Sequence, residues 1–171
     1  MIIFVFICFI FIEKYKIIKK HNDIINRFKK LKNKEYKIVC EPILLSTNKK
    51  KKNINKNNKK TFKMIYEIDF DCSVCLVKLK KYYDLYLKLL KICKVDFIII
   101  TSENSISYIK FYLDRTLKNY DIYIVNQKFI IDGADLYLLD RSNKIIMAGD
   151  IKKYPFLRKE YIRRLKKHCL N

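Results

Sequence analysis

The chain has 171 residues, of which 50% are hydrophobic and 14% aromatic, so it can build one domain with a tail and is too apolar for a disordered chain. Only two glycines and two prolines exclude collagen-like and linker-like classes. The formal net charge of +21 is compatible with an anionic membrane surface or with nucleic acid. However, only six of the 38 basic residues are arginine, which argues against specific nucleic-acid contacts.

The chain begins with an unbroken apolar run from Ile2 to Ile12, closed by Glu13. Eleven residues are about half of a comfortable membrane span but match the apolar core of a signal sequence. Because no small-residue cleavage site follows, we expect residues 1–16 to be an uncleaved N-terminal anchor. The alternative is a leader that lies on the membrane surface. The lysines that follow favour a cytoplasmic carboxyl side.

Residues 17–60 read as a separate segment with a high positive charge. Apolar residues recur at a loose helical spacing over 17–31, and Tyr36–Val39 alternates like a short strand that Pro42 ends. Residues 48–60 then hold seven lysines and five asparagines in thirteen positions. Such a block is typical of a solvated loop, and the alternative function is an electrostatic patch for anionic lipid or nucleic acid.

Residues 61–171 have the pattern of a folded α/β domain. A strand over 64–70 precedes a helix over 72–94 with a regular apolar stripe, and 95–101 is a β-branched run typical of a buried strand. A second helix over 106–117, a strand over 121–125, a hairpin over 136–148 and a last helix from Pro155 follow. This order predicts a parallel sheet with helices on both faces.

Cys72-Ser-Val-Cys75 falls between the predicted strand and the predicted long helix. A sulfur at a helix N-terminus is stabilised as thiolate by unpaired N–H groups and by the helix dipole. Cys75, one turn further, can then resolve a mixed disulfide, so the pair is suited to thiol–disulfide exchange. The charge of Asp71 should raise the pKa of the Cys72 thiol, and Lys78 acts in the opposite direction.

The other readings of the cysteines are structural or metal-binding. The C-x-x-C could be half a zinc site, but no second pair of this kind exists, and Cys93, His168 and Cys169 would have to supply the missing ligands. Cys93 lies on the apolar stripe of the long helix and is expected to be a small buried hydrophobe. Cys8, Cys40 and Cys169 have no role assigned. We therefore expect no cofactor and no metal.

The stretch from Met64 to Lys167 resembles thioredoxin-like domains of the redoxin type. Specifically, it resembles small membrane-anchored or lipoprotein thiol–disulfide oxidoreductases of AT-rich bacteria, which also carry a strand like that of residues 33–42. The hairpin LYLLDRSNKIIMAGD over 136–150 matches the closing hairpin of that family. The resemblance implies a three-layer sandwich with a central mixed sheet, helices on both faces and an N-terminal hydrophobic segment. It also implies export to the cell envelope.

Three positions depart from the family pattern. The proline that usually precedes the hairpin, in cis and packed against the disulfide, should fall at Ala134 or Asp135. The tryptophan usual before the first cysteine is Asp71, and the buried acid of thioredoxins would be Tyr66. A non-proline cis bond costs about 3 kcal/mol, so we expect a trans peptide here. Without the proline, Cys72 and Cys75 should also be more open to zinc, with Asp135 as a third ligand or a proton acceptor for Cys75.

The sequence therefore predicts a membrane-tethered thiol–disulfide oxidoreductase with Cys72 as nucleophile and Cys75 as resolving thiol. Its partners would be a protein disulfide or dithiol and, through residues 2–12, a membrane. One alternative is a non-catalytic envelope or adaptor module that keeps the fold as a scaffold, because the proline is missing. The other is a basic binder of anionic lipid or nucleic acid. The predicted division is 1–16, 17–60 and 61–171.

Overall fold

The computed structural model describes residues 10–16, 18–19, 22–23, 26, 30–31, 34–35, 38, 43–47, 61–68, 73–101, 105–117, 119–126 and 134–170, without the side chains at 46 and 73–76. The chain forms two compact units, Met1–Leu31 and Lys32–Asn171. In the first unit every described residue from 10 to 31 is helical, in agreement with the helix expected over 17–31. The boundaries after residues 16 and 60 remain predictions.

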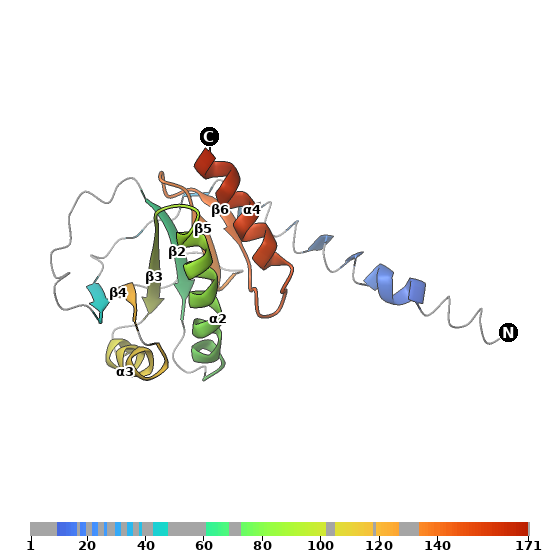
Figure 1. Ribbon diagram of the computed structural model, residues 1–171. Helices are drawn as coiled ribbons and strands as arrows, with labels where there is room; N and C mark the ends of the chain where they lie inside the picture. Colours follow the sequence, from blue (N-terminus) through green and yellow to red (C-terminus); the bar gives the residue numbers. More distant parts are fainter. Residues whose placement is uncertain are drawn as a thin grey trace. The chain divides into compact units, whose positions relative to one another are not determined.

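The second unit is built on a six-stranded mixed sheet in the order β1-β4-β3-β2-β5-β6 (Figure 1). The strands are β1 (Ile43–Ser46), β2 (Phe62–Glu67), β3 (Val95–Thr101), β4 (Asp121–Asn126), β5 (Leu136–Leu139) and β6 (Ile145–Ala148). Strands β2, β3 and β4 are parallel, as the alternation of strands and helices predicts. The hairpin β5–β6 continues the sheet antiparallel to β2, and β1 pairs antiparallel with β4.

The strand expected over Tyr36–Val39 is not the first strand of the sheet. Of those four residues the structure describes only Ile38, which is not in a strand, whereas β1 begins after Pro42. Proline cannot donate a hydrogen bond within a sheet, so it limits a strand from either side, and β1 follows Pro42 in the sequence instead of preceding it. Glu35 forms an isolated bridge with Lys144, so the segment before Pro42 does reach the sheet, at the edge opposite β1.

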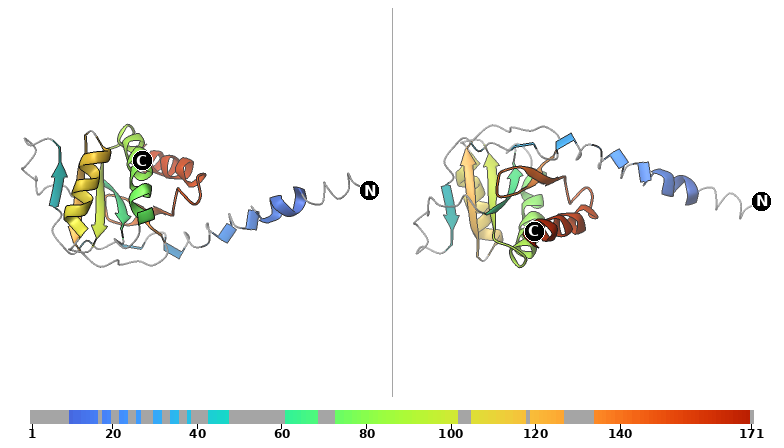
Figure 2. Two further views of the ribbon diagram at one scale, coloured as in Figure 1. Left: turned by 90° about the horizontal axis from the view of Figure 1, so that it is seen from below. Right: turned by 90° about the horizontal axis from the view of Figure 1, so that it is seen from above.

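Three helices accompany the strands: α2 (Ser73–Leu90), α3 (Ile106–Thr116) and α4 (Leu157–Leu170). Helix α2 contacts both β3 and α4, and the two helices lie side by side against the sheet (Figures 1 and 2). The predicted apolar stripe of α2 is buried at Leu79, Tyr82, Tyr83 and Tyr86. In β3 only Asp96 is half-buried and all other residues are buried, so both faces of the sheet are covered at its centre.

The closing hairpin ends where the sequence predicts. Gly149 has a φ of +144°, and a Cβ added there would meet Leu157 Cδ1 at 2.6 Å. Glycine is therefore required both by the backbone conformation and by the close approach of α4. In the hairpin turn, Asn143 has a φ of 63°, a conformation that asparagine tolerates better than most residues. The observed elements confirm an α/β fold with a central mixed sheet.

Candidate active site

The predicted thiol pair lies at the junction of β2 and α2. Strand β2 ends at Glu67 and helix α2 begins at Ser73, so the sequence position of Cys75 is in the first helical turn. Cys72 lies outside the described residues, as do residues 69–71. The first turn of α2 contains no acidic residue that would oppose a negative charge at this helix end. The end of β2 and the start of α2 therefore stand on either side of Cys72 in the sequence, the order from which thiolate stabilisation was predicted.

Lys78 stands one turn after Cys75 on α2 and forms two ion pairs across the domain. Its Nζ donates to Asp135 Oδ2, just before β5, and lies 2.8 Å from Asp150 Oδ2, just after β6. The side chains of Lys78 and Asp150 are only 16% and 15% exposed, and that of Asp135 is 39% exposed. We call Lys78, Asp135 and Asp150 the ion cluster.

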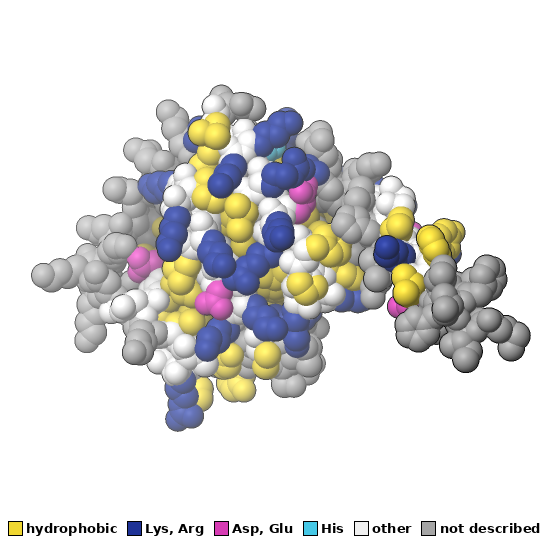
Figure 3. All heavy atoms as spheres, turned by 45° about the vertical axis from the view of Figure 1, so that its right-hand side comes forward, with side chains coloured by type: hydrophobic (Ala, Val, Ile, Leu, Met, Phe, Trp, Pro, Cys, Tyr) yellow, Lys and Arg dark blue, Asp and Glu magenta, His cyan; other side chains and the backbone are white. Residues whose placement is uncertain are grey.

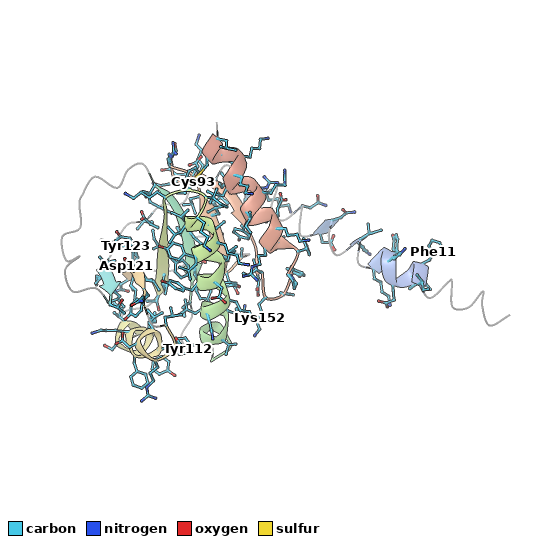
Figure 4. The ribbon with its side chains drawn as sticks, in the orientation of Figure 1. Phe11, Cys93, Tyr112, Asp121, Tyr123 and Lys152 are labelled. Atoms are coloured by element: carbon cyan, nitrogen blue, oxygen red, sulfur yellow. A yellow bond between two sulfur atoms is a disulfide. The ribbon has the colours of Figure 1, made fainter. Side chains whose placement is uncertain are left out.

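Asp150 is held by several donors at once. The Tyr82 hydroxyl donates to Asp150 Oδ1 at 2.8 Å, and the backbone N–H groups of Lys152 and Lys153 donate to the same oxygen at 2.7 and 3.0 Å. Burial acts to raise the pKa of Asp150, but hydrogen bonds from Lys78, Lys153 and Tyr82 outweigh it and lower the pKa. Asp150 is therefore ionised near neutral pH. Figure 4 labels Lys152 in the turn that supplies these donors.

Lys78 itself stays protonated. Burial acts to lower its pKa, but the hydrogen bonds to Asp135 and Asp150 outweigh burial and raise it. The hydroxyl of Tyr82 remains neutral, because burial and then the charge of Asp150 raise its pKa. The cluster thus places one ammonium group between two carboxyl groups from distant parts of the sequence.

Ala134 and Asp135 are the two positions at which the resemblance would place the family's proline. The described residues contain no cis peptide bond, so the bond between Ala134 and Asp135 is trans, as expected, whereas the bond before Ala134 involves a residue outside the described ones. The Asp135 carbonyl accepts a hydrogen bond from the N–H of Glu67 at 2.9 Å, so this segment lies beside the end of β2. The Asp135 carboxylate is bound by Lys78 through Oδ2.

Tyr66 stands where thioredoxins have a buried acid. Its side chain is fully buried, and its ring meets that of Tyr82 edge-on with centroids 4.6 Å apart. An aromatic pair therefore stands at the position where the resemblance would place a buried carboxyl. The carboxyl groups that bind Lys78 and Tyr82 of α2 come from the segments before β5 and after β6. Asp150 was not among the predicted site residues. The opposite effects predicted for Asp71 and Lys78 on the pKa of Cys72 stay predictions, because residues 71 and 72 lie outside the described residues.

Cys93 and Cys169 form a disulfide with Cα atoms 6.5 Å apart, within the usual range for this bond (Figure 4). The expectation that Cys93 is a buried hydrophobe on the helix stripe is therefore wrong. Helix α2 ends at Leu90, and Cys93 lies half-buried in the following turn, beside the last turn of α4. The alternative use of Cys93 and Cys169 as zinc ligands is also wrong, because bonded sulfurs are not thiolates.

Other predicted features fall wholly or partly outside the described residues. The structure does not describe residues 1–9, which hold most of the apolar run, or the Lys/Asn-rich block over 48–60. Within the part of the chain that the structure describes, no helix is both long and apolar enough to cross a bilayer. Among the same residues, no three His, Cys, Asp or Glu side chains gather as metal ligands would.

No protein-family model and no curated protein matches the chain. Among solved structures, it resembles an uncharacterized thioredoxin-like protein from Porphyromonas gingivalis, with a TM-score of 0.50 and 18% identity over 79% of this chain and 95% of the other. For a thiol-disulfide isomerase from Corynebacterium glutamicum the TM-score is 0.49, with 11% identity over 76% of this chain and 96% of the other. For the thioredoxin domain of a thiol-disulfide oxidoreductase from Bacteroides vulgatus the TM-score is 0.46, with 12% identity over 75% of this chain and 96% of the other. The first of these likenesses, with the sheet order above, shows that the fold is thioredoxin-like.

Proposed function

We propose that this chain is a thiol–disulfide oxidoreductase that works through Cys72 and Cys75. The observation that carries the proposal is a C-x-x-C sequence at the β2–α2 junction of a thioredoxin-like fold. A helix N-terminus is where a thiolate gains from free N–H groups and from the helix dipole. Solved thiol-disulfide oxidoreductases and isomerases are among the proteins that share this architecture.

The reaction proceeds in two exchange steps. The Cys72 thiolate attacks one sulfur of a substrate disulfide, the substrate S–S bond breaks, and the other substrate sulfur leaves as a thiolate that takes up a proton. The Cys75 thiol then loses its proton and attacks the Cys72 sulfur. The mixed disulfide breaks and the second substrate thiolate leaves. The substrate is reduced by two electrons, and Cys72 and Cys75 are oxidised to a disulfide; the reverse sequence oxidises a dithiol.

The test must separate this pair from the other cysteines. Cys93 and Cys169 already form a disulfide, so a count of free thiols in the whole chain would not distinguish that disulfide from one between Cys72 and Cys75. We would therefore equilibrate the full chain with glutathione buffers, block free thiols with a maleimide and quantify the peptides that carry residues 72–75 and 93 by mass spectrometry. The expected result is a two-electron transition in the first peptide, lost in C72S/C75S and retained in C93A/C169A.

The alternative, a module that keeps the fold without catalysis, is favoured by Ala134 and Asp135 in place of proline. Absence of any redox transition at residues 72–75, together with disulfide reduction at the background rate, would support that alternative. If the transition is present, a C75S variant expressed in its host should trap substrates as mixed disulfides on Cys72. Identifying the trapped proteins would show which class of protein is the substrate.

We further propose that the protein works in the cell envelope, tethered by residues 2–12. The Cys93–Cys169 disulfide supports this location, because such bonds persist in oxidising compartments and are rare in the cytosol. The full chain should then sediment with membranes and resist carbonate extraction, whereas deletion of residues 1–14 should release it. Recovery of the full chain in the soluble fraction would contradict the tether.

The third reading, a basic binder, has less support in the described part of the chain. Figure 3 shows lysine and arginine side chains spread among apolar ones on one face, rather than gathered in a single patch. The densest block of lysines, residues 48–60, lies outside the described residues. Anion binding that weakens steeply with added salt would revive this reading.

A further inference from the structure

The ion cluster joins three elements next to the proposed thiol pair. Backbone positions three apart on a helix lie on one face, so positions 75 and 78 belong to the same side of α2. Asp135 reaches Lys78 from the segment before β5, and Asp150 reaches it from the turn after β6. Lys78 thus fixes both ends of the β5–β6 hairpin against the first two turns of α2.

Among the described residues, three tyrosines lie next to the cluster, and the charged residues Glu67, Lys152 and Lys153 adjoin it through their backbone N–H groups. Tyr82 donates to Asp150 from α2, Tyr66 packs on Tyr82 from β2, and Tyr161 faces the cluster from α4. Burial raises the pKa of the Tyr82 and Tyr161 hydroxyls, so neither carries charge near neutral pH. Replacing Lys78 by a neutral residue would therefore leave two carboxyl groups without their cation, one turn from Cys75.

The backbone around the cluster is well supported without Lys78. The Tyr161 hydroxyl lies 2.7 Å from the carbonyl oxygen of Leu136 and 3.1 Å from that of Gly149, the residues next to Asp135 and Asp150. The Gly149 N–H also donates to the Leu136 carbonyl at 2.9 Å. These bonds join the two segments to each other and to α4, so the hairpin can stay folded when Lys78, its contact to α2, loses its charge.

We propose that Lys78 is a positioning residue for the resolving thiol: it holds the Ala134–Asp135 segment against α2 and keeps a positive charge one turn from Cys75, which favours the thiolate form of Cys75. This inference rests on the proposed function for its biological meaning. In place of the proline ring that packs beside the disulfide in the resembling family, this chain uses an ion pair between Lys78 and Asp135. The ammonium also offsets the two carboxyl groups that would otherwise oppose ionisation of the thiol.

The experiment measures the ionisation of Cys75 directly. In the full chain carrying C72S, iodoacetamide alkylation of the peptide with residue 75 is followed by mass spectrometry from pH 5 to pH 10. Lys78→Gln should raise the midpoint of the rate profile by about one pH unit, which is about tenfold less thiolate at a pH below the midpoint. Lys78→Arg keeps the charge and should restore the profile. Lys80→Gln, at an exposed position of the same helix, is the matched control.

Three results would decide the matter. Coincident profiles for Lys78→Gln and its C72S parent, with both proteins folded by circular dichroism, would overturn the proposal. An equal shift in Lys80→Gln would also overturn it, since any surface lysine would then suffice. Because alkylation needs no disulfide exchange, a shift specific to Lys78 in a chain without a redox transition would contradict the proposed function and leave the role of Lys78 intact.

Discussion

The two ends of helix α2 are tied to the rest of the domain by different kinds of bond. At its N-terminal end Lys78 forms ion pairs with Asp135 and Asp150, next to a thiol pair proposed to open and close. Beyond its C-terminal end Cys93 is joined covalently to Cys169 of α4. The difference agrees with the proposed function: ion pairs would hold the segments beside Cys75 while its bonds change, whereas a disulfide fixes the far end.

The distance between the two ends keeps the two sulfur pairs separate. Helix α2 has 18 residues, and at 1.5 Å per residue it is about 27 Å long. Cys93 lies beyond its end and Cys75 in its first turn, so direct exchange between them within one molecule is excluded. The Cys93–Cys169 bond is therefore a structural cross-link and not a relay for the proposed active pair.

Removing the covalent tie should have the largest effect on stability. The Cys93–Cys169 bond closes a loop with a sequence separation of 76, and the chain-entropy account gives about 4 kcal/mol for a loop of this size. We expect C93A/C169A to lower the free energy of unfolding by roughly this amount in urea. The redox transition at residues 72–75 should keep its midpoint.

The control for this comparison is the wild-type chain under reducing conditions. Dithiothreitol should lower the stability of the wild type to that of C93A/C169A measured in the same reducing buffer, since any effect on the 72–75 pair is common to both proteins. Equal stability of the two proteins in oxidising buffer would contradict a structural role. A change in the redox midpoint of residues 72–75 in C93A/C169A would contradict the conclusion that the two sulfur pairs at the ends of α2 act independently.

The N-terminal end can be loosened through Tyr161, a fully buried side chain of α4. Its hydroxyl donates to the carbonyls of Leu136 and Gly149, which flank Asp135 and Asp150. Tyr161→Phe leaves these buried acceptors with one partner fewer, at a cost of about 2 kcal/mol in the free energy of unfolding. Denaturant unfolding measures this cost, and Tyr108→Phe on the exposed face of α3 is the control.

Tyr161→Phe also distinguishes the two ends of α2. Hydrogen exchange should quicken at the N–H groups of Gly149, Lys152 and Lys153, which are bonded near the ion cluster. It should stay unchanged at Cys93, whose N–H donates to Leu89. Faster hydrogen exchange at both ends would mean that α4 stabilises the two ends of α2 together. The two ends would then not be held independently.

Most of the fold could be predicted because its signals are local. The β-branched run of β3, the apolar stripe of α2 and the glycine that ends the hairpin each lie within one element. Strand β1 was not predicted, because its pairing partner, β4, lies more than 70 residues away and nothing within Ile43–Ser46 specifies it. Cys93 was misjudged because the apolar period continues past Leu90, where the helix ends.

Only the part of the candidate site that lies within one continuous segment of the sequence could be predicted. Cys72 and Cys75 with the helix start form a local pattern, and the structure places the helix start where that pattern requires. The ion cluster joins residues 78, 135 and 150, which the sheet order β2-β5-β6 brings together. Disulfide connectivity between Cys93 and Cys169 likewise depends on the packing of α2 against α4, since six cysteines allow many pairings.

The smallest expected effect concerns ion pairs within α4 itself, away from both ends of α2. Glu160 accepts hydrogen bonds from Arg163 and Arg164, one turn along the helix, and these bonds together with the nearby positive charges lower its pKa to about 2. A carboxyl whose folded pKa lies below its unfolded value of 4.5 stabilises the folded state above pH 4.5. That contribution is lost as pH falls from 4.5 towards 2.

Glu160→Gln should therefore lower Tm by only about 1–2 °C at neutral pH, as expected for a surface ion pair. The difference between the wild type and Glu160→Gln should shrink as the pH of the melting experiment is lowered through that window, because only the wild type loses a stabilising charge there. Thermal melts at several pH values measure this. If Glu160→Gln were as damaging as Tyr161→Phe, α4 would be held by its own charges, and the ties at the two ends of α2 would be secondary.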